Sequence, residues 1–150
     1  MRKWFLGFGS FILAAAMAWA AGPMPDTFFV HFTDPVVISS QLTLPPGNYK
    51  FQRITKPTDP AVFTVINGDT GKVIGTTPPA DITQNGEDAR MNQHGFLVVD
   101  QLNGKDYLDS VHMQGTAHGF MFQQANDIRG RLESNGGQKI KIDIQTGGQE

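Results

Sequence analysis

The sequence predicts an all-β protein, either an antiparallel β-sandwich or a jelly-roll or barrel-like roll of about eight or nine strands, after an N-terminal signal helix. From Phe28 onward, apolar residues alternate with polar ones or form short runs, which is the period of strands. Clusters of Gly, Pro, Asn and Asp separate these runs, as turns do. The 150-residue chain contains no cysteine, so it must bury its core without disulfides, which a domain of this length can do.

The first twenty residues have the features of a secretory signal peptide. Arg2 and Lys3 precede an uncharged apolar run from Trp4, and Ala18 and Ala20 supply the small residues that a signal peptidase requires. We therefore expect export to the periplasm or the extracellular space of a bacterium. The predicted segments are a signal peptide, a flexible N-terminal segment, a single β-domain and a disordered tail, at 1–20, 21–27, 28–145 and 146–150.

Charge and composition exclude two classes of partner. The formal net charge is −2, and it becomes −4 once the leader removes Arg2 and Lys3. Nucleic-acid binding needs a basic stripe, and attraction to anionic lipid needs clustered basic residues, and the sequence has neither. An uncut anchor is the alternative to cleavage, but Gly7 and Gly9 interrupt the apolar run, and no cysteine is present to carry a lipid. We therefore expect no nucleic acid and no stable membrane anchor after cleavage.

The strands follow in order along the chain. The first is Phe28–Phe32, and the second is Val36–Leu44, whose even-numbered apolar residues share one face. In the last, Lys139–Ile144, three isoleucines alternate with charged residues, as expected of a sheet with one face in water. Six further candidates lie between them, at Asn48–Thr55, Ala61–Ile66, Lys72–Thr77, Phe96–Asp100, Tyr107–Met113 and Gly119–Gln123.

Turn residues separate these strands, and two stretches do not fit the strand pattern. The predicted turns lie at 45–47, 67–71, 103–104 and 135–137. The polar stretch Pro78–Gln93 is predicted to be a long loop with one helical turn around Glu87–Met91. The stretch Phe122–Leu132 is consistent with a short helix, or with a strand and a loop.

The segment Leu44–Tyr49, LPPGNY, is predicted to form a corner between two strands. Pro45 and Pro46 fix φ and lack an N–H donor, Gly47 allows a sharp turn, and Tyr49 returns an aromatic ring to the core. This segment resembles the LPAGxY motif of small exported bacterial β-sandwich proteins, abundant in acidobacteria, and the similarity extends from about Asp34 to Thr77. The resemblance implies architecture, and no catalytic residue is carried over with it.

Histidines are the first candidates for a metal site. If the strands carrying His112 and His118 are antiparallel neighbours, the two imidazoles come together, and Asp106 or Asp109 adds a carboxylate. The compact spacings that put two histidine ligands on one element are absent. The alternative is that both are hydrogen-bonded sheet residues at the edge of the core. No cofactor is expected.

Other catalytic patterns are weak. The chain has no G-x-S-x-G elbow, and its serines have no recognisable catalytic setting. Segment 67–71, NGDTG, resembles the start of a calcium loop, but Lys72 replaces the required glycine, so a hairpin turn explains it. Carboxylate pairs for glycosidic chemistry can be drawn from Asp100, Asp106, Asp109 and Glu133, and the sequence selects none.

We therefore expect an exported, non-enzymatic binding or assembly module with an unknown protein or glycan partner. Self-assembly by strand addition is one binding mode, with Phe28–Phe32 and the preceding residues pairing with the sheet edge of a neighbouring copy. One alternative is a metal-dependent or hydrolytic enzyme that uses His112 and His118. A second is a carbohydrate-binding domain, which needs at least two exposed rings on one face. The candidate rings, most of them expected in the core, are Phe28, Phe29, Phe32, Tyr49, Phe51, Phe63, Phe96, Tyr107, Phe120 and Phe122.

Overall fold

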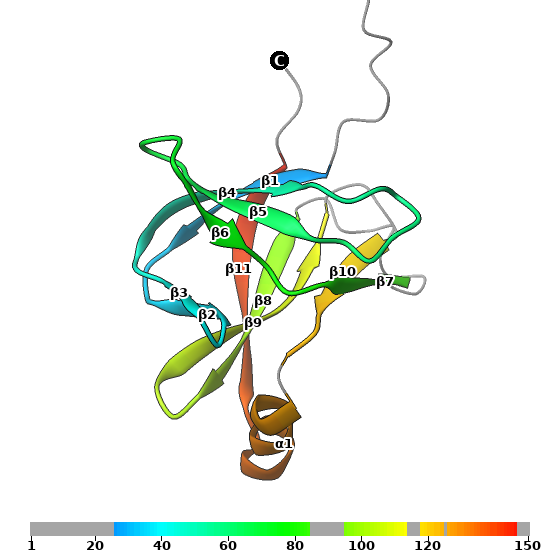
Figure 1. The fold of residues 1–150 in the computed structure, drawn as a ribbon. Coiled ribbons are helices and arrows are strands. Elements are labelled where there is room, and N and C mark those ends of the chain that lie inside the picture. The colour runs from blue at the N-terminus through cyan, green and yellow to red at the C-terminus, as the bar shows by residue number, and fades with distance from the viewer. Residues whose placement is uncertain (1–25, 85–94, 114–117, 125, 147–150) are drawn as a thin grey trace, which may run out of the picture.

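The structure is a computed structural model that describes residues 26–84, 95–113, 118–124 and 126–146 (Figure 1). The predicted signal peptide, residues 21–25 and 147–150, and the predicted helical turn at Glu87–Met91 lie outside these ranges. No helix in the described ranges is long and apolar enough to cross a membrane. The elements are β1 Thr27–Phe32, β2 Val36–Ser39, β3 Leu42–Leu44, β4 Gly47–Arg53, β5 Phe63–Asn67, β6 Val73–Thr76, β7 Ala80–Gln84, β8 Phe96–Leu102, β9 Lys105–His112, β10 His118–Phe122, α1 Asn126–Asn135 and β11 Gln138–Thr146.

The strands form one sheet that curls into a nearly closed barrel, which confirms the predicted all-β, barrel-like class (Figure 1). Nine strands follow the order β3-β2-β9-β8-β11-β1-β4-β5-β6. Each of these pairs is antiparallel except β2 with β9, which is parallel. β10 also pairs with β9, and β7 pairs with β10. β9 therefore has β2 as a neighbour at Asp106 and Tyr107, and β10 at Ser110 to His112.

The barrel closes with little backbone pairing. Ala61 and Ala80 exchange two backbone hydrogen bonds of 2.8 and 2.7 Å, which join the segment before β5 to the start of β7. Between the end strands β3 and β6 the contact is through a side chain, because a Cβ atom on Gly75 would lie 3.1 Å from Leu42 Cδ2. Gly75 thus leaves the space in which Leu42 packs.

Aromatic rings fill the interior. Phe28 stacks on Phe51 with ring centroids 4.8 Å apart, and Phe63 meets the Phe120 ring edge-on at 5.3 Å. Such pairs add stabilisation beyond the area they bury. The predicted core position is confirmed for the buried rings Phe28, Phe32, Tyr49, Phe51, Phe63, Phe120 and Phe122. Three other candidate rings are at least partly exposed: Phe29, Phe96 and Tyr107.

The LPPGNY corner forms as predicted, and Tyr49 closes it. The ring of Tyr49 is buried against Phe32, and its hydroxyl donates a 2.5 Å hydrogen bond to the Pro45 carbonyl. Gly47 has φ of +156°, a value that L side chains rarely adopt. The tyrosine therefore satisfies a carbonyl at the corner while its ring joins the core.

Two predicted elements need correction. The segment Val36–Leu44 is a hairpin of two strands with a turn at Ser40 and Gln41, because β2 pairs back onto β3 with an irregularity after Val37. The predicted loop Pro78–Gln93 contains strand β7, which finds its hydrogen bonds on β10. In the stretch Phe122–Leu132 the short-helix alternative is confirmed, because β10 ends at Phe122 and α1 begins at Asn126.

The remaining turns follow the predicted chemistry. Asn103 and Gly104 both have positive φ, of 53° and 76°, as a two-residue hairpin turn between β8 and β9 requires. Asn67 Oδ1 accepts the backbone N–H groups of Asp69 and Thr70, which confirms the hairpin turn at NGDTG. The faces of β11 are also as predicted, with Ile144 buried and Lys139 and Lys141 exposed.

Candidate functional site

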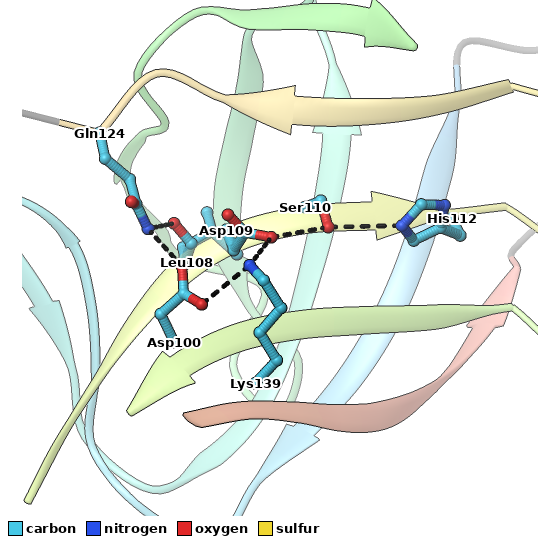
Figure 2. A network of polar contacts seen from close by, with 7 residues as sticks. All are labelled: Asp100, Leu108, Asp109, Ser110, His112, Gln124 and Lys139. Carbon is cyan, nitrogen blue, oxygen red and sulfur yellow. Dashed lines mark hydrogen bonds and ion pairs between the residues drawn. The ribbon is translucent and has the colours of Figure 1, made fainter. Parts of the chain in front are cut away.

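A polar network crosses β8, β9 and β11 (Figure 2). Lys139 Nζ lies 3.0 Å from Asp100 Oδ1 and 3.3 Å from Asp109 Oδ2. The strand register produces this arrangement, because Lys139 is directly opposite Asp100. The Asp100 side chain is 6% exposed, whereas that of Lys139 is 64% exposed. The ammonium group therefore approaches a buried carboxylate from the solvent side.

A β-bulge places Asp109 in this network. Val98 is opposite Ser110 and Val99 is opposite Leu108, which leaves Asp109 as the extra residue on β9. In a regular strand, residues 108 and 111 would face opposite sides. The bulge changes the alternation, so that Leu108 and Val111 both lie in the core.

Ser110 links Asp109 to His112. The Ser110 hydroxyl donates to Asp109 Oδ2 at 3.1 Å, and its oxygen lies 3.4 Å from His112 Nε2 (Figure 2). In a serine nucleophile triad the histidine lies between the serine and the carboxylate. Here the serine lies between the other two, so the order does not fit removal of its proton by His112.

Burial changes the ionisation of this cluster. Burial raises the pKa of Asp109, and the nearby Asp100 raises it further, while Lys139 acts in the opposite direction. Burial also lowers the pKa of His112, against the effect of Asp109. The pKa of Lys139 is raised: burial opposes its charge, but the two carboxylates outweigh that effect. The lowered pKa favours an uncharged His112 ring, and the raised pKa favours a protonated Lys139 that is shared by Asp100 and Asp109.

A cavity of about 360 Å³ lies beside the network. Its walls are the hairpin residues 37–40, the Pro78–Pro79 segment, Tyr107 and Leu108 of β9, residues 122–124 at the end of β10 and just after it, and Ile128 of α1. It therefore lies where β2 and β10 separate along the edge of β9. Its lining contains no charged side chain, and the polar groups are hydroxyls and amides.

Gln124 joins the cavity to the network. Its Nε2 donates to Asp100 Oδ2 at 3.2 Å and to the Leu108 carbonyl at 3.1 Å (Figure 2). Leu108 lies between the β9 residues that pair with β2 and the β9 residues that pair with β10. The Gln124 amide therefore gives the Leu108 carbonyl the hydrogen bond that a neighbouring strand would otherwise supply. Both N–H groups are used inside the protein, which leaves the amide oxygen as the acceptor available to a ligand.

The predicted histidines are on neighbouring strands, as the metal hypothesis required. β9 and β10 are antiparallel, but Gly119 rather than His118 is opposite His112. The side chain of His118 and all of His94 lie outside the described part of the chain. Within that part, no group of three or more His, Asp or Glu side chains is placed to hold a metal ion.

The candidate carboxylates separate into three places. Asp100 and Asp109 share Lys139, whose ammonium group occupies the space between them. Asp106 lies near the start of β9, opposite Gln101, and Glu133 is exposed on α1. Sequence reasoning missed Lys139 and Gln124 as site residues. The exposed face of β11 was a signal for Lys139, whereas Gln124 carried none.

Comparison of the chain with protein-family models, with curated proteins and with solved structures finds no match. The fold and the site by themselves define a small, nearly closed barrel-like β-protein with a cavity at its side that is lined by uncharged side chains.

Proposed function

We propose that the protein is an exported, non-enzymatic binding module that takes an uncharged small molecule, with an apolar body and a hydrogen-bond donor, into the cavity beside Gln124. The supporting observation is the cavity lining, which is mainly apolar and contains the Gln124 amide held by Asp100 and Leu108. Ligand sites of proteins combine an apolar lining with a few fixed polar groups in this way. A charged ligand would lose its hydration here without gaining an ionic partner.

The catalytic alternative has less support. A hydrolase built on His112 needs a nucleophile that can lose its proton to the imidazole, and the Ser110 hydroxyl donates to Asp109 instead. A glycosidase built on Asp100 and Asp109 needs space for a sugar between two carboxyl groups, where Lys139 lies. The binding role requires neither step.

Binding in the cavity is tested with the neutral dye Nile red, whose fluorescence rises in an apolar site. We expect saturable binding to the wild type and a loss of at least about tenfold in affinity for Ser40→Trp, because an indole at this exposed position fills the cavity mouth. Ser134→Trp is the matched control, since Ser134 is exposed on α1 and outside the cavity lining.

Equal affinity of both variants, or tighter binding of an anionic dye of similar size, would contradict the proposal. Export is tested separately, by fractionation of the bacterium and N-terminal sequencing of the recovered protein. A chain that begins at Ala21 in the envelope or culture fraction is the expected result.

A further inference from the structure

A second hollow, of about 410 Å³, lies on the outer face of the barrel over β1. β1 lies between β11 and β4, and its residues Phe28, Val30 and Phe32 are buried in the core. By alternation, Phe29 and His31 face outward, and both line this hollow. Its other polar lining side chains are Asn48, Asp69, Asp143 and Gln145.

A chain of hydrogen bonds holds three of these side chains in place. His31 Nδ1 lies 2.7 Å from Asn48 Oδ1, and because an amide oxygen only accepts, Nδ1 carries the proton. Asn48 Nδ2 donates to Asp69 Oδ1 at 3.1 Å. Several groups are then left for a ligand: Nε2 of the His31 ring, the second carboxylate oxygen of Asp69 and the second amide hydrogen of Asn48.

The turn that carries Asp69 reaches Asn48 because residue 68 is glycine. The Gly68 N–H donates to the Asn48 carbonyl at 2.7 Å. A Cβ atom on Gly68 would lie 3.0 Å from that carbonyl oxygen, tighter than nine in ten real Cβ contacts, so the Asn48 backbone would have to give by a few tenths of an ångström. The wall of the hollow formed by Asp69 therefore depends on this close approach.

The polar side chains of the hollow suit a ligand that carries several small hydrogen-bonding groups better than they suit a single ion. In the described ranges, no three His, Asp or Glu side chains converge on a metal position. Asn48 and Gln145 supply N–H donors, which an organic cation would leave without an acceptor. A hydroxyl group both donates and accepts, so it can pair with carboxylates and amides alike. Phe29, 39% exposed, adds an apolar surface at the same place. Tyr49, the other ring in the lining, is buried, so the hollow offers one exposed ring instead of the two expected of a carbohydrate-binding face, and it suits a single sugar unit.

We propose that this hollow binds one sugar unit of a glycan, with the C–H face of the sugar ring on Phe29 and its hydroxyls on Asn48, Asp69 and Asp143. The site is separate from the cavity beside Gln124 and does not depend on that proposal. Lys50 Nζ lies 5.9 Å from the centre of the Phe29 ring, at the outer limit of a cation–π contact, so a sugar displaces it at little cost.

The test is an NMR titration of ¹⁵N-labelled protein with the methyl glycosides of glucose, galactose, mannose and N-acetylglucosamine at millimolar concentrations. At least one sugar is expected to shift the amides of residues 29–31, 48, 68–69 and 143–145. Asp143→Asn keeps the shape of that side chain and removes its charge. The affinity of this variant for the sugar should fall about tenfold, because one hydrogen bond to a charged group is lost.

Asp81→Asn is the control, because Asp81 is an exposed carboxylate on β7 outside the hollow, and its affinity should not change. Asn48→Ala should also lose binding, and its amide spectrum away from the hollow shows whether it folds. Absence of shifts with all four sugars overturns the proposal. So does a response of the same amides to 1,4-diaminobutane alone, which would assign the hollow to an organic cation.

Discussion

Arg53 and Lys139 are two cations that each bind several acceptors, and their surroundings differ. The Arg53 side chain is 7% exposed, and its Nη1 lies 3.1 Å from Asp26 Oδ2. Its Nη2 donates to the carbonyls of Lys56 and Asp59, each at 3.0 Å, and its guanidinium lies over the Phe120 ring. Lys139 instead reaches its two carboxylates from solvent. The guanidinium fixes the path of a loop, whereas the ammonium group neutralises a cluster that the sheet already places.

The largest effect is expected for Arg53→Lys. A lysine ammonium is a point charge and cannot serve the separate acceptors that the planar guanidinium reaches, so two loop carbonyls lose their donors. We expect a loss of about 3 kcal/mol in the free energy of unfolding, measured by urea denaturation. The reverse exchange, Lys139→Arg, is the matched control, and we expect it to stay within about 0.5 kcal/mol because its site is open to solvent. Equal losses in the two variants would remove the distinction between them.

Lys139→Met should have the next largest effect. The variant leaves Asp100 and Asp109 facing each other without a cation, and Asp100 is buried. A loss of about 1 to 2 kcal/mol in the free energy of unfolding is expected. Adding Asp109→Asn to this variant should restore part of that stability by removing one of the two charges. No recovery in the double variant would show that Lys139 stabilises by packing alone.

Asp106 is a buried carboxyl group with no basic partner in the described structure, in contrast to Asp26, Asp100 and Asp109, which are paired with Arg53 or Lys139. Its Oδ1 has no hydrogen-bond partner among the described residues. Burial raises its pKa, and the charge of Asp34 raises it further, while a hydrogen bond with the Gln101 side chain acts in the opposite direction. Because a raised pKa favours the protonated folded state, this group stabilises the fold in acid and loses that contribution as pH rises through the folded-state pKa.

Asp106→Asn should therefore be more stable than the wild type at neutral pH, by about 1 kcal/mol. The difference should shrink toward zero in acid, where Asp106 is protonated and neutral like asparagine. Urea denaturation of both proteins across the acidic pH range measures this convergence. A variant that is less stable than the wild type at neutral pH would contradict the prediction.

The smallest effect is expected from His112. Its lowered pKa means that the unfolded chain binds a proton more readily, so its contribution is present above the usual histidine pKa and declines as pH falls below it. The raised pKa of Asp109 acts in the opposite direction. His112→Gln should therefore lose less stability than the wild type between neutral and mildly acidic pH, by a few tenths of a kcal/mol. An NMR titration of the His112 ring provides the direct measurement.

Local patterns predicted much of the fold, and the misses have physical causes. The alternation of β11, the corner closed by Tyr49 and the turn at Asn103 depend on nearby residues only. The turn at Ser40 and Gln41 contains no glycine or proline, so the hairpin was not evident. β7 is a mainly polar strand whose pairing with β10 depends on distant residues.

The candidate site was less predictable, because a strand register decides it. His112 was a predicted site residue, and Asp109 a predicted carboxylate, but the bulge that turns Asp109 toward Lys139 depends on pairing with β8. The same applies to Gln124, which belongs to the site because its amide caps the Leu108 carbonyl. Sequence patterns give the face of a strand, and they do not give which residue lies opposite on its neighbour.

The β2–β3 hairpin gives the cavity a wall that is held by buried side chains more than by backbone pairing. β2 joins β9 through the residue pairs Val36 with Asp106 and Val37 with Tyr107, so few hydrogen bonds hold it. Val36, Ile38 and Leu44 are nevertheless buried, and exposing each costs roughly 1.5 to 3 kcal/mol. Opening of the hairpin is therefore rare, so this wall of the cavity keeps its shape although few backbone hydrogen bonds hold it to β9.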